Sequence, residues 1–519
     1  MDKKWWTLIA VCAGTFMLLL DVTIVVVALP QIQTALNASF SDVQWVIDAY
    51  ALTLASLLLT TGVLADRYGR RRLFVIGLII FTLGSLTCGL AQSPIMLIVS
   101  RSGQGVGGAI VFATSLALLA QSFRGKDRGV AFGIWGAITG VAVSLGPILG
   151  GAITTGISWR GIFLVNVPVG IAAVAITLVK VEESRAPHPG RPDWGGFVLL
   201  TTGLVAFVYG LIRASETTWG SSSVIISLAL GVALLVGFVL LEFRIDHPMF
   251  DMSLFRTPTF VGGLLAAFAM NGSLFAMFLY LVLYLQDILG YSALDTGLRL
   301  LVSTGGTFLA AGISGRLSEH VPVRYLIAPG LLLVGIGLLL MSGLSGTSTW
   351  THLLPGFIVA GVGAGLVNPP LASTAIGVVT PQRSGMASGV NSTFRQIGFA
   401  MSIAALGSIF ASALRNHITR ALASVPALAS QSSRVVSAIR QGDAARAIAS
   451  APPAVRGQLA AAIRSSFASG VDVLLVVTAV VAFVGATASL LLIRRKDFLT
   501  RQAPSEQASQ GQELLTGAP

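Results

Sequence analysis

The sequence predicts an all-α membrane protein that crosses the bilayer many times. Of its 519 residues, 54% are hydrophobic and only 10% are charged, too few polar residues to cover a water-soluble fold of this length. Runs of roughly 18 to 25 apolar residues recur along the chain, and each is long enough to cross the hydrocarbon core as a helix. A strongly basic turn at residues 62–72 separates two of these runs. These features indicate a polytopic helical protein.

The basic turn 62–72 orients the first spans. It holds four arginines within six residues, between the apolar runs 49–64 and 73–90. Lysine and arginine accumulate in the cytoplasmic loops of membrane proteins, so this turn is expected on the cytoplasmic side. Its single acid, Asp66, stands where it can pair with a loop arginine or with the end of a neighbouring helix.

We predict fourteen spans, with boundaries set to within about four residues. They are 6–29, 45–64, 73–91, 95–120, 129–153, 161–180, 195–213, 222–242, 260–285, 294–316, 324–343, 352–379, 389–412 and 470–493. The first run carries Asp21 in its middle and lacks an A-x-A cleavage site, so we interpret it as a retained span and not as a signal peptide.

The positive charges favour an even number of spans with both termini in the cytoplasm. With the N-terminus inside, only Arg160 and Arg213 fall on short outer loops. The predicted location is therefore the cytoplasmic (plasma) membrane, as a multi-pass protein surrounded by lipid. The net charge of +12 follows from this topology, so it does not indicate a nucleic-acid partner.

The segment 413–469 is expected to be a long external loop. It carries seven arginines and the single acid Asp443, and it contains Pro452-Pro453. Its apolar residues fall at helical spacing, which predicts short amphipathic helices broken at the prolines; a lipid-headgroup or substrate-access role is the alternative to a mobile hairpin. These apolar residues are Val435, Val436, Ile439, Leu459, Ile463 and Phe467. Residues 498–519 are predicted to form a disordered cytoplasmic tail.

An internal repeat divides the chain into two halves. A shift of 253 residues lays Gly62 on Gly315, and a shift of 256 residues lays Gly129 on Gly385. Such repeats are common in secondary transporters, whose substrate sites lie near the midplane where the halves meet. The predicted organisation is two six-helix bundles, 1–190 and 251–497, with an inserted pair of membrane helices at 191–250.

Several enzyme and ATPase signatures are missing from the sequence. The Gly125-Lys126 pair is followed by Asp127, so it does not complete a phosphate-binding loop of the type G-x-x-x-x-G-K-[ST]. We find no H-E-x-x-H, no clustered His and Cys residues and no G-x-S-x-G elbow in a soluble domain. The expectation is a protein that is not an enzyme, with no cofactor and no metal site.

Residues 62–72 resemble the signature loop G-x-L-A-D-R-x-G-R-R of the major facilitator superfamily. Further segments resemble its fourteen-span drug:proton antiporters, although Gly161 departs from the pattern W-R-W-I-F-x-I-N-x-P. They are Leu20-Asp21-Val-Thr23-Ile24-Val-Val-Val-Ala28-Leu29-Pro30, Arg101-Ser-Gly-Gln104-Gly105, Gly140 with Gly146-Pro147-Ile-Leu-Gly150-Gly151, Trp159-Arg160-Gly161-Ile162-Phe163-Leu-Val-Asn166-Val-Pro168, Tyr284-Leu285-Gln286 with Gly290-Tyr291-Ser292, and Ser388-Gly389 with Asn391 and Arg395-Gln396. The similarity covers about residues 5–410 and the last span. It implies the major facilitator fold.

Charged groups buried in the bilayer are costly and generally functional, and Asp21, Asp48 and Arg101 are the candidates for proton coupling. Asp21 lies near the middle of the first span, where it can exchange a proton for a cationic substrate; the resemblance implies the same role. The alternative is a structural carboxylate bound by Thr23 or by a neighbouring helix. Asp48 is either a second proton or cation site or a helix N-terminal acid favoured by the dipole. Arg101 either favours the ionised form of a nearby carboxylate or serves helix packing. We assign no coupling role to Arg299 or Arg395.

Gating is predicted at the basic turn and in the fifth span. Asp66 with Arg70 is expected to form an inner gate or a conformational latch. The resemblance implies the same gate for Gly62, Arg67, Gly69 and Arg71. In the fifth span, Gly146-Pro147 is expected to introduce a kink that shapes the closed outer half.

A substrate cavity is expected where aromatic, flexible and polar residues occur on spans that border the centre. Methionine and aromatic side chains suit varied hydrophobic ligands, whereas ordinary packing or lipid contact is the alternative for each of them. The candidates are Phe16, Met17, Phe112, Trp135, Met270, Asn271, Phe275, Met277 and Phe278.

The sequence therefore predicts proton-coupled efflux of small hydrophobic, often cationic drugs or antibiotics by alternating access. The alternative is a dedicated exporter of one endogenous metabolite, such as a self-made antibiotic, a peptide or a siderophore. A monomer is expected to suffice for either function.

Overall fold

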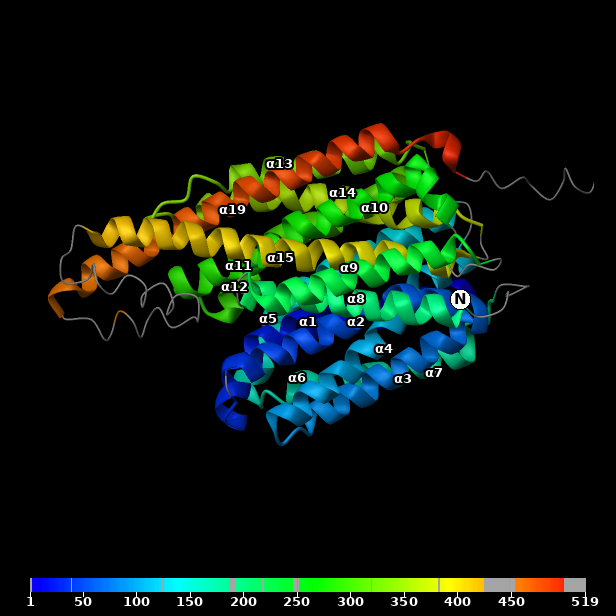
Figure 1. Ribbon diagram of the computed structural model, residues 1–519, viewed down its shortest axis with the longest axis horizontal. Coiled ribbons are helices and arrows are strands. Elements are labelled where there is room, and N and C mark those ends of the chain that lie inside the picture. Colours follow the sequence, from blue (N-terminus) through cyan, green and yellow to red (C-terminus); the bar gives the residue numbers. More distant parts are fainter. Residues whose placement is uncertain are drawn as a thin grey trace, which may run out of the picture.

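The computed structural model of the chain is almost wholly helical, and the residues that it describes contain no strand. The helices lie side by side along one direction (Figure 1). This arrangement fits a bilayer, where each helix satisfies its own backbone hydrogen bonds. The described residues are 2–38, 40–123, 126–185, 193–216, 219–245, 250, 252–318, 320–380, 383–423, 448 and 453–498.

The first seven helices form one bundle. They are α1 (Lys3–Leu36), α2 (Phe40–Tyr68), α3 (Arg70–Gly89), α4 (Pro94–Ser122), α5 (Lys126–Gly156), α6 (Gly161–Leu164) and α7 (Asn166–Lys180). Helix α4 packs against α2 and α3, and α1 packs against α5 and α7. In Figure 1, α3, α4, α6 and α7 lie along the lower edge of the molecule. The small residues of α4, including four glycines between Gly103 and Gly108, permit this close packing at its centre.

A second bundle is built from the residues after Thr257. It contains α10 (Pro258–Met270), the π-helical turn η2 (Asn271–Phe275), α11 (Ala276–Leu283), the π-helical turn η3 (Tyr284–Ile288), α12 (Ala293–Leu317), α13 (Arg324–Leu340), α14 (Leu354–Gly377), α15 (Ser384–Ala423) and α19 (Arg456–Leu492). Helix α14 packs against α12 and α13, and α19 packs against α10, α13 and α15. Figure 1 places α13, α14 and α19 along the upper edge.

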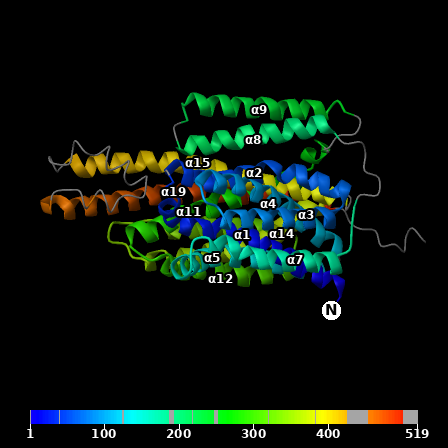
Figure 2. The same cartoon turned by 90° about the horizontal axis from the view of Figure 1, so that it is seen from below.

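Helices α8 (Trp194–Glu216) and α9 (Ser222–Glu242) form a separate layer on one side of the molecule. Figure 2 shows α9 outermost and α8 between it and the rest of the protein. Helix α8 contacts both α2 and α15, and the hydroxyls of Thr60 and Thr201 are 3.0 Å apart. The pair therefore covers the outside of the contact between α2 and α15. Helix α9 exposes Ile225, Ile226 and Leu230, an apolar surface suited to lipid.

Each of the fourteen predicted spans coincides with helix. Within the described residues, eleven helices are long and apolar enough to cross a membrane, or twelve if the bent α5 counts as one span. Helix α13 is apolar but only 17 residues long, and α12 carries Asp295, Arg299 and Arg316. The polytopic helical prediction is thus confirmed, and the count of fourteen crossings stays a prediction.

The expected loop 413–469 is shorter than predicted, because helix continues into it from both sides. Helix α15 extends to Ala423 and α19 begins at Arg456. Leu414 and Ile418 of α15 belong to the same buried apolar cluster as Leu459 and Ile463 of α19. This apolar seam stabilises both helices beyond the expected membrane boundary. Helix is therefore present at Leu459, Ile463 and Phe467 as predicted, but it is continuous with the last span and not a separate short helix. Val435, Val436 and Ile439 lie outside the described residues.

The predicted tail, residues 498–519, begins with a residue that the structure describes. Phe498 packs against the second bundle, next to Gly377. The carboxylate of Asp497 accepts hydrogen bonds from the backbone N–H and the hydroxyl of Thr259, at 3.3 and 2.8 Å. These contacts attach the end of the last helix to the start of α10. Residues 499–519 lie outside the described part of the chain.

Two glycine contacts join the bundles at the end where the basic turn 62–72 lies. A Cβ atom added at Gly62 of α2 would collide with the carbonyl oxygen of Gly385 in α15. Likewise, a Cβ atom at Gly315 of α12 would lie 2.5 Å from the carbonyl oxygen of Gly129 in α5. A shift of 253 residues carries Gly62 to Gly315, and a shift of 256 residues carries Gly129 to Gly385. The α2–α15 and α5–α12 contacts therefore occupy equivalent positions in the sequence repeat.

Candidate functional site

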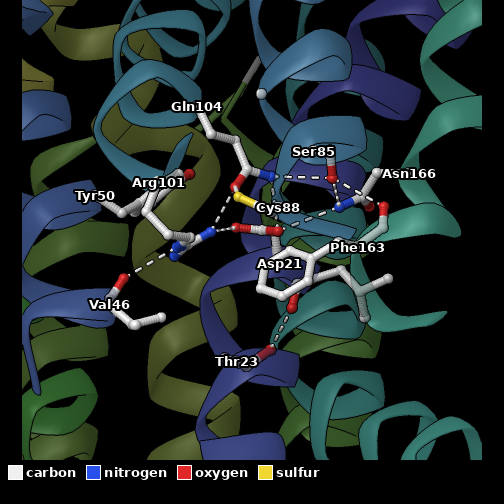
Figure 3. A network of polar contacts seen from close by, with 12 residues as sticks. Asp21, Thr23, Val46, Tyr50, Ser85, Cys88, Arg101, Gln104, Phe163 and Asn166 are labelled. Carbon is white, nitrogen blue, oxygen red and sulfur yellow. Dashed lines mark hydrogen bonds and ion pairs between the residues drawn. The ribbon is translucent and has the colours of Figure 1, made fainter. Parts of the chain in front are cut away.

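Asp21 lies inside the first bundle with no exposed surface. Figure 3 shows its carboxylate facing Arg101 of α4, whose Nη1 atom is 2.5 Å from Oδ2. The other carboxylate oxygen, Oδ1, accepts hydrogen bonds from Nε2 of Gln104 at 2.9 Å and from Nδ2 of Asn166 at 3.2 Å. Both oxygens are thus bound by donors, the arrangement expected for an ionised carboxylate.

Ser85 of α3 connects the same donors from the far side of the network. Its hydroxyl accepts hydrogen bonds from Gln104 Nε2 at 3.2 Å and Asn166 Nδ2 at 3.0 Å, and it donates to the Phe163 carbonyl at 2.8 Å. Four helices, α1, α3, α4 and α7, therefore hold one buried ion pair. Satisfying every member matters because an unpaired charge in a low-dielectric interior is strongly unfavourable.

Arg101 also connects this network to α2. Its Nε atom donates to the carbonyl of Val46 at 3.1 Å, and its guanidinium lies 4.2 Å from the ring centroid of Tyr50. A further hydrogen bond joins Nη1 to Gln104 Oε1 at 2.7 Å. The guanidinium is only 1% exposed, so it does not extend toward the membrane surface. Any change in the charge of Asp21 therefore acts directly on the group that holds α4 against α2.

The structure bears on two alternative interpretations: Thr23 as the partner of Asp21, and Asp48 as a helix N-terminal acid. The Thr23 hydroxyl donates to the carbonyls of Leu19 and Leu20 in its own helix, so it is not the partner of Asp21. Asp48 is half-buried on α2, two residues from both Val46 and Tyr50. It lies eight residues after Phe40, the first residue of α2, and therefore beyond the first turn, which weakens the interpretation as an N-terminal acid.

The predicted gate pair joins the two bundles. Asp66 Oδ1 of α2 accepts from Nε and Nη2 of Arg70, the first residue of α3, at 2.9 and 2.7 Å. The same carboxylate accepts the backbone N–H groups of Gly385 and Met386 at 2.9 and 2.8 Å. These two amides belong to the first turn of α15, where free N–H groups and the helix dipole favour an anion. Asp66 therefore caps α15 from the opposite bundle.

Glycines make this contact possible. The collision that a Cβ at Gly62 would cause with Gly385 means that α2 and α15 meet backbone to backbone, one turn before Asp66. Gly69 has φ = 113°, a conformation that favours glycine, and a Cβ there would lie 2.8 Å from the Glu183 carboxylate. That carboxylate accepts the backbone N–H groups of Arg71 and Arg72, both at 3.1 Å. Glu183 thus caps the start of α3.

The basic side chains of the turn differ in their surroundings. Arg70 is buried and paired, whereas Arg67 is half-buried, with its guanidinium 5.7 Å from the ring centroid of Tyr68. Arg71 donates to the carbonyl of Leu178 on α7. The structure therefore brings Asp66, Arg70 and Gly62 into the contact between bundles, and it places Arg67, Gly69 and Arg71 beside the first bundle only.

Helix α5 bends where Gly146-Pro147 occurs. Its segments Asp127–Val143 and Ile148–Gly156 meet at 44°. A Cβ at Gly146 would collide with the hydroxyl of Thr23, so the bend brings α5 close to α1, two residues from Asp21. The side chain of Pro147 lies outside the described residues. The expected kink is present, and its role in gating stays a prediction.

The predicted cavity residues fall into two groups. Met17, Phe112 and Trp135 pack in one buried cluster of the first bundle, where the indole N–H of Trp135 donates to the Thr15 hydroxyl at 3.1 Å. Phe16 lies against a neighbouring cluster of the same bundle. The second group borders the core of the other bundle and consists of Met270, Asn271, Phe275, Met277 and Phe278. The rings of Phe275 and Phe278 are 6.1 Å apart, and Asn271 donates to the carbonyl of Ala267.

Sequence reasoning missed several functional neighbours. Gln104 and Asn166 enter the sequence prediction only as family motif residues, and Ser85 and Glu183 are not among its candidates. The spacing of Arg101 and Gln104, three residues apart on one helix face, was the available signal for Gln104. Ser85 offered no such signal, because its role depends on the rotation of α3. Among the described residues, no group of three or more His, Cys, Asp or Glu side chains is arranged to hold a metal ion.

Comparison with known proteins places this geometry in a family. A sequence model described as Major Facilitator Superfamily matches residues 11–403. The chain belongs to the major facilitator superfamily. It is 37% identical over 424 residues to the Multidrug resistance protein Stp of Mycobacterium tuberculosis, covering 80% of this chain and 78% of that protein. It is 32% identical over 517 residues to the Tetracenomycin C resistance and export protein of Streptomyces glaucescens, covering 97% and 94%.

A solved structure shares the fold. The human organic anion transporter MFSD10 (TETRAN) aligns with a TM-score of 0.62 over 94% of this chain and 100% of that chain, at 13% identity. At this identity the likeness concerns the fold alone. The superfamily and its helical architecture, expected from residues 62–72 and the later motifs, are thus confirmed.

Proposed function

We propose that this chain exports small hydrophobic, often cationic drugs or antibiotics across the cytoplasmic membrane in exchange for protons, and that Asp21 carries the proton. The observation that carries this proposal is the buried ion pair of Asp21 with Arg101. The names of the relatives, which refer to multidrug resistance and to export of an antibiotic, support drug efflux over the export of one endogenous metabolite.

Protonation of Asp21 removes one partner of the ion pair. The guanidinium of Arg101 is then left buried without a counter-charge, a state that is unfavourable by several kcal/mol. Relief requires Arg101 to move, and Arg101 holds α2 through Val46 and Tyr50. Helix α2 carries Asp66 near its other end. Proton binding at Asp21 and closure of the bundles at α15 are therefore linked through one helix.

Asp21 has no exposed surface, so a substrate does not reach it in this conformation. We infer that substrate and proton act on each other indirectly, through the position of α2 relative to α4. The predicted cavity residues Met17, Phe112 and Trp135 belong to the bundle that contains the pair. One elementary charge that crosses 100 mV gains about 2.3 kcal/mol, so one net charge per cycle supports roughly a fiftyfold gradient.

The topology completes the proposal. We place both termini and the basic turn 62–72 in the cytoplasm, with fourteen spans and one chain as the functional unit. The contact between Asp66 and α15 then closes the cytoplasmic side in this conformation. With the cytoplasmic side closed, the cavity opens to the outside, from where the proton is taken up.

The test uses inside-out vesicles that contain the protein and a preformed proton gradient. Adding rhodamine B ethyl ester, a lipophilic cation, is expected to dissipate the gradient. Asp21→Asn is expected to abolish this response, and Asp295→Asn, which removes an acid paired with Arg299 in the other bundle, serves as the matched control. If Asp21→Asn still pumps against a gradient with unchanged pH dependence, Asp21 is structural and Asp48 becomes the leading proton carrier.

A further inference from the structure

Arg395 is a buried arginine without a carboxylate. It lies in α15 and is 7% exposed. Its Nε atom donates to Oδ1 of Asn391 and its Nη1 atom donates to Oδ1 of Asn368 on α14, both at 3.2 Å. Its third nitrogen, Nη2, is buried and has no hydrogen-bond partner. Among the described residues, no carboxylate lies within ion-pair distance of this guanidinium.

Three other arginines in the spans each have an acid partner. Arg101 has Asp21, Arg70 has Asp66, and Arg299 has Asp295 at 3.4 Å. A buried cation without a counter-charge is strongly destabilising, so such a group inside a membrane span generally has a functional role. The two asparagine oxygens neutralise only part of this cost, because they are dipoles and not charges.

The unfilled hydrogen-bonding capacity at this site consists of donors. Asn391 has no exposed surface, and its Nδ2 atom also lacks a partner, while its oxygen is occupied by Arg395. The unpaired donors of Arg395 and Asn391 lie on two hydrogen-bonded side chains that together carry one positive charge. They therefore require a hydrogen-bond acceptor. A guanidinium binds planar oxyanions through two parallel hydrogen bonds, which makes a carboxylate its best complement.

The site faces the other bundle. Ser388, Asn391 and Arg395 follow each other at spacings of three and four residues, so they share one face of α15. The Ser388 hydroxyl on this face donates to the carbonyl of Ala113 in α4, at 3.0 Å. A shift of 256 residues relates Asn391 to Trp135, which the sequence analysis assigned to the substrate cavity. The face therefore borders the space between the bundles.

The depth of Arg395 agrees with a substrate site. It lies eleven residues after Ser384, the first residue of α15. At a rise of 1.5 Å per residue this is about 16 Å along the helix from the end that Asp66 caps, and about 9 Å inside the predicted span 389–412. Arg395 therefore lies within the span, and secondary transporters bind their substrates inside the membrane where the two halves meet.

We propose that Arg395 and Asn391 bind an anionic oxygen group of the exported compound, a carboxylate or an ionised phenol, and that Asn368 orients the guanidinium. This assignment rests on the proposed function, since it names a chemical feature of the compounds that the chain exports. It extends their range from lipophilic cations to amphiphiles that carry an acid.

Two dyes with one xanthene core test the assignment. Rhodamine B carries a free carboxylate, and in rhodamine B ethyl ester that group is esterified. Binding of each dye to the purified full-length protein is measured by fluorescence anisotropy. We expect wild-type protein to prefer rhodamine B by about tenfold or more, because a hydrogen bond to a charged group is involved. Arg395→Gln is expected to erase this preference through weaker binding of rhodamine B alone.

Two further variants control for structural effects. Arg395→Lys keeps the charge but loses the planar fork, so an intermediate preference is expected. Arg299→Gln removes an arginine of another span that already has an acid partner, and it is expected to leave the preference unchanged. Size-exclusion chromatography checks that each variant is folded.

The outcomes are distinct from those of the proposed function. Equal binding of the two dyes by wild-type protein, or an equal loss of both in Arg395→Gln, overturns the assignment of an anion subsite. Proton-driven transport of the ester can still occur in either case. Conversely, a carboxylate preference that depends on Arg395 in a protein that moves no protons supports the subsite and refutes the antiport mechanism.

Discussion

Replacing Asp66 by asparagine tests whether the carboxylate holds the two bundles together. Asp66 accepts four hydrogen bonds, but the two from Arg70 stay within α2 and its continuation into α3. Only the backbone amides of Gly385 and Met386 belong to the other bundle. The asparagine side chain has one oxygen that can still accept from the backbone N–H of Gly385 or Met386. Its NH2 group then faces the other backbone N–H, and two donors cannot form a hydrogen bond. At least one of the two bonds between the bundles is therefore lost.

The expected size of the effect follows from these contacts. A hydrogen bond to a charged group contributes about 1.5–3 kcal/mol. Removing the negative charge from the N-terminus of α15 costs about 0.3–1 kcal/mol more. We expect the contact to weaken by about 2–4 kcal/mol, which changes the ratio of closed to open protein by roughly 30- to 800-fold. Transport should slow severely, whereas equilibrium binding of a hydrophobic cation should stay largely intact because Asp66 lies at the rim.

The assay measures the distance between spin labels on the two bundles by pulsed electron resonance. Tyr68 and Tyr325 are exposed positions for cysteine labels, one on each bundle, in a variant that lacks Cys12 and Cys88. Asp295→Asn is the matched control, because Asp295 forms an equivalent pair four residues from Arg299, and the hydrogen bonds described for it are to Ser292 and Arg299 of its own bundle. Unchanged distances in Asp66→Asn, or lost binding in a folded variant, would show that Asp66 is not the latch.

Three further predictions concern the glycines and the topology. Gly62→Ala is expected to push α2 away from α15 and to reduce transport at least tenfold. The control Gly237→Ala should leave transport unchanged, because a Cβ there meets no atom within 4 Å. Equal effects of both variants would contradict the close contact of α2 with α15. Gly69→Ala is expected to lower the free energy of unfolding by about 1–3 kcal/mol, because φ = 113° strains any residue with a Cβ and Glu183 occupies its place; an unchanged thermal midpoint would refute this. A reporter fused after Arg72 should be cytoplasmic and one fused at Gly442 external, and opposite results from either would refute the fourteen-span topology.

Much of the fold was predictable because it depends on the composition of single segments. A run such as Ser222–Glu242 is apolar on every side, and a bilayer is the only solvent that suits such a helix. The repeat that relates Gly62 to Gly315 and Gly129 to Gly385 also indicates, from the sequence alone, that the two halves are equivalent. The extents of α15 and α19 were not predictable in this way. Both helices continue because Leu414 and Ile418 meet Leu459 and Ile463, which are distant in sequence.

The sequence by itself determined that the chain is a helical membrane protein of the major facilitator superfamily. It also singled out Asp21 and Arg101 as charged groups within apolar runs, and Asp66 as the single acid of the basic turn. Only the tertiary structure decided their partners. Asp21 meets Arg101, Gln104 and Asn166 from two other helices, Asp66 meets the first turn of α15, and Arg395 meets no acid among the described residues. The physical reason is that a charged residue inside an apolar run can be recognised from that run alone, because burying it is costly. The partner that offsets this cost comes from another helix, so it depends on how helices distant in sequence are rotated and packed against each other.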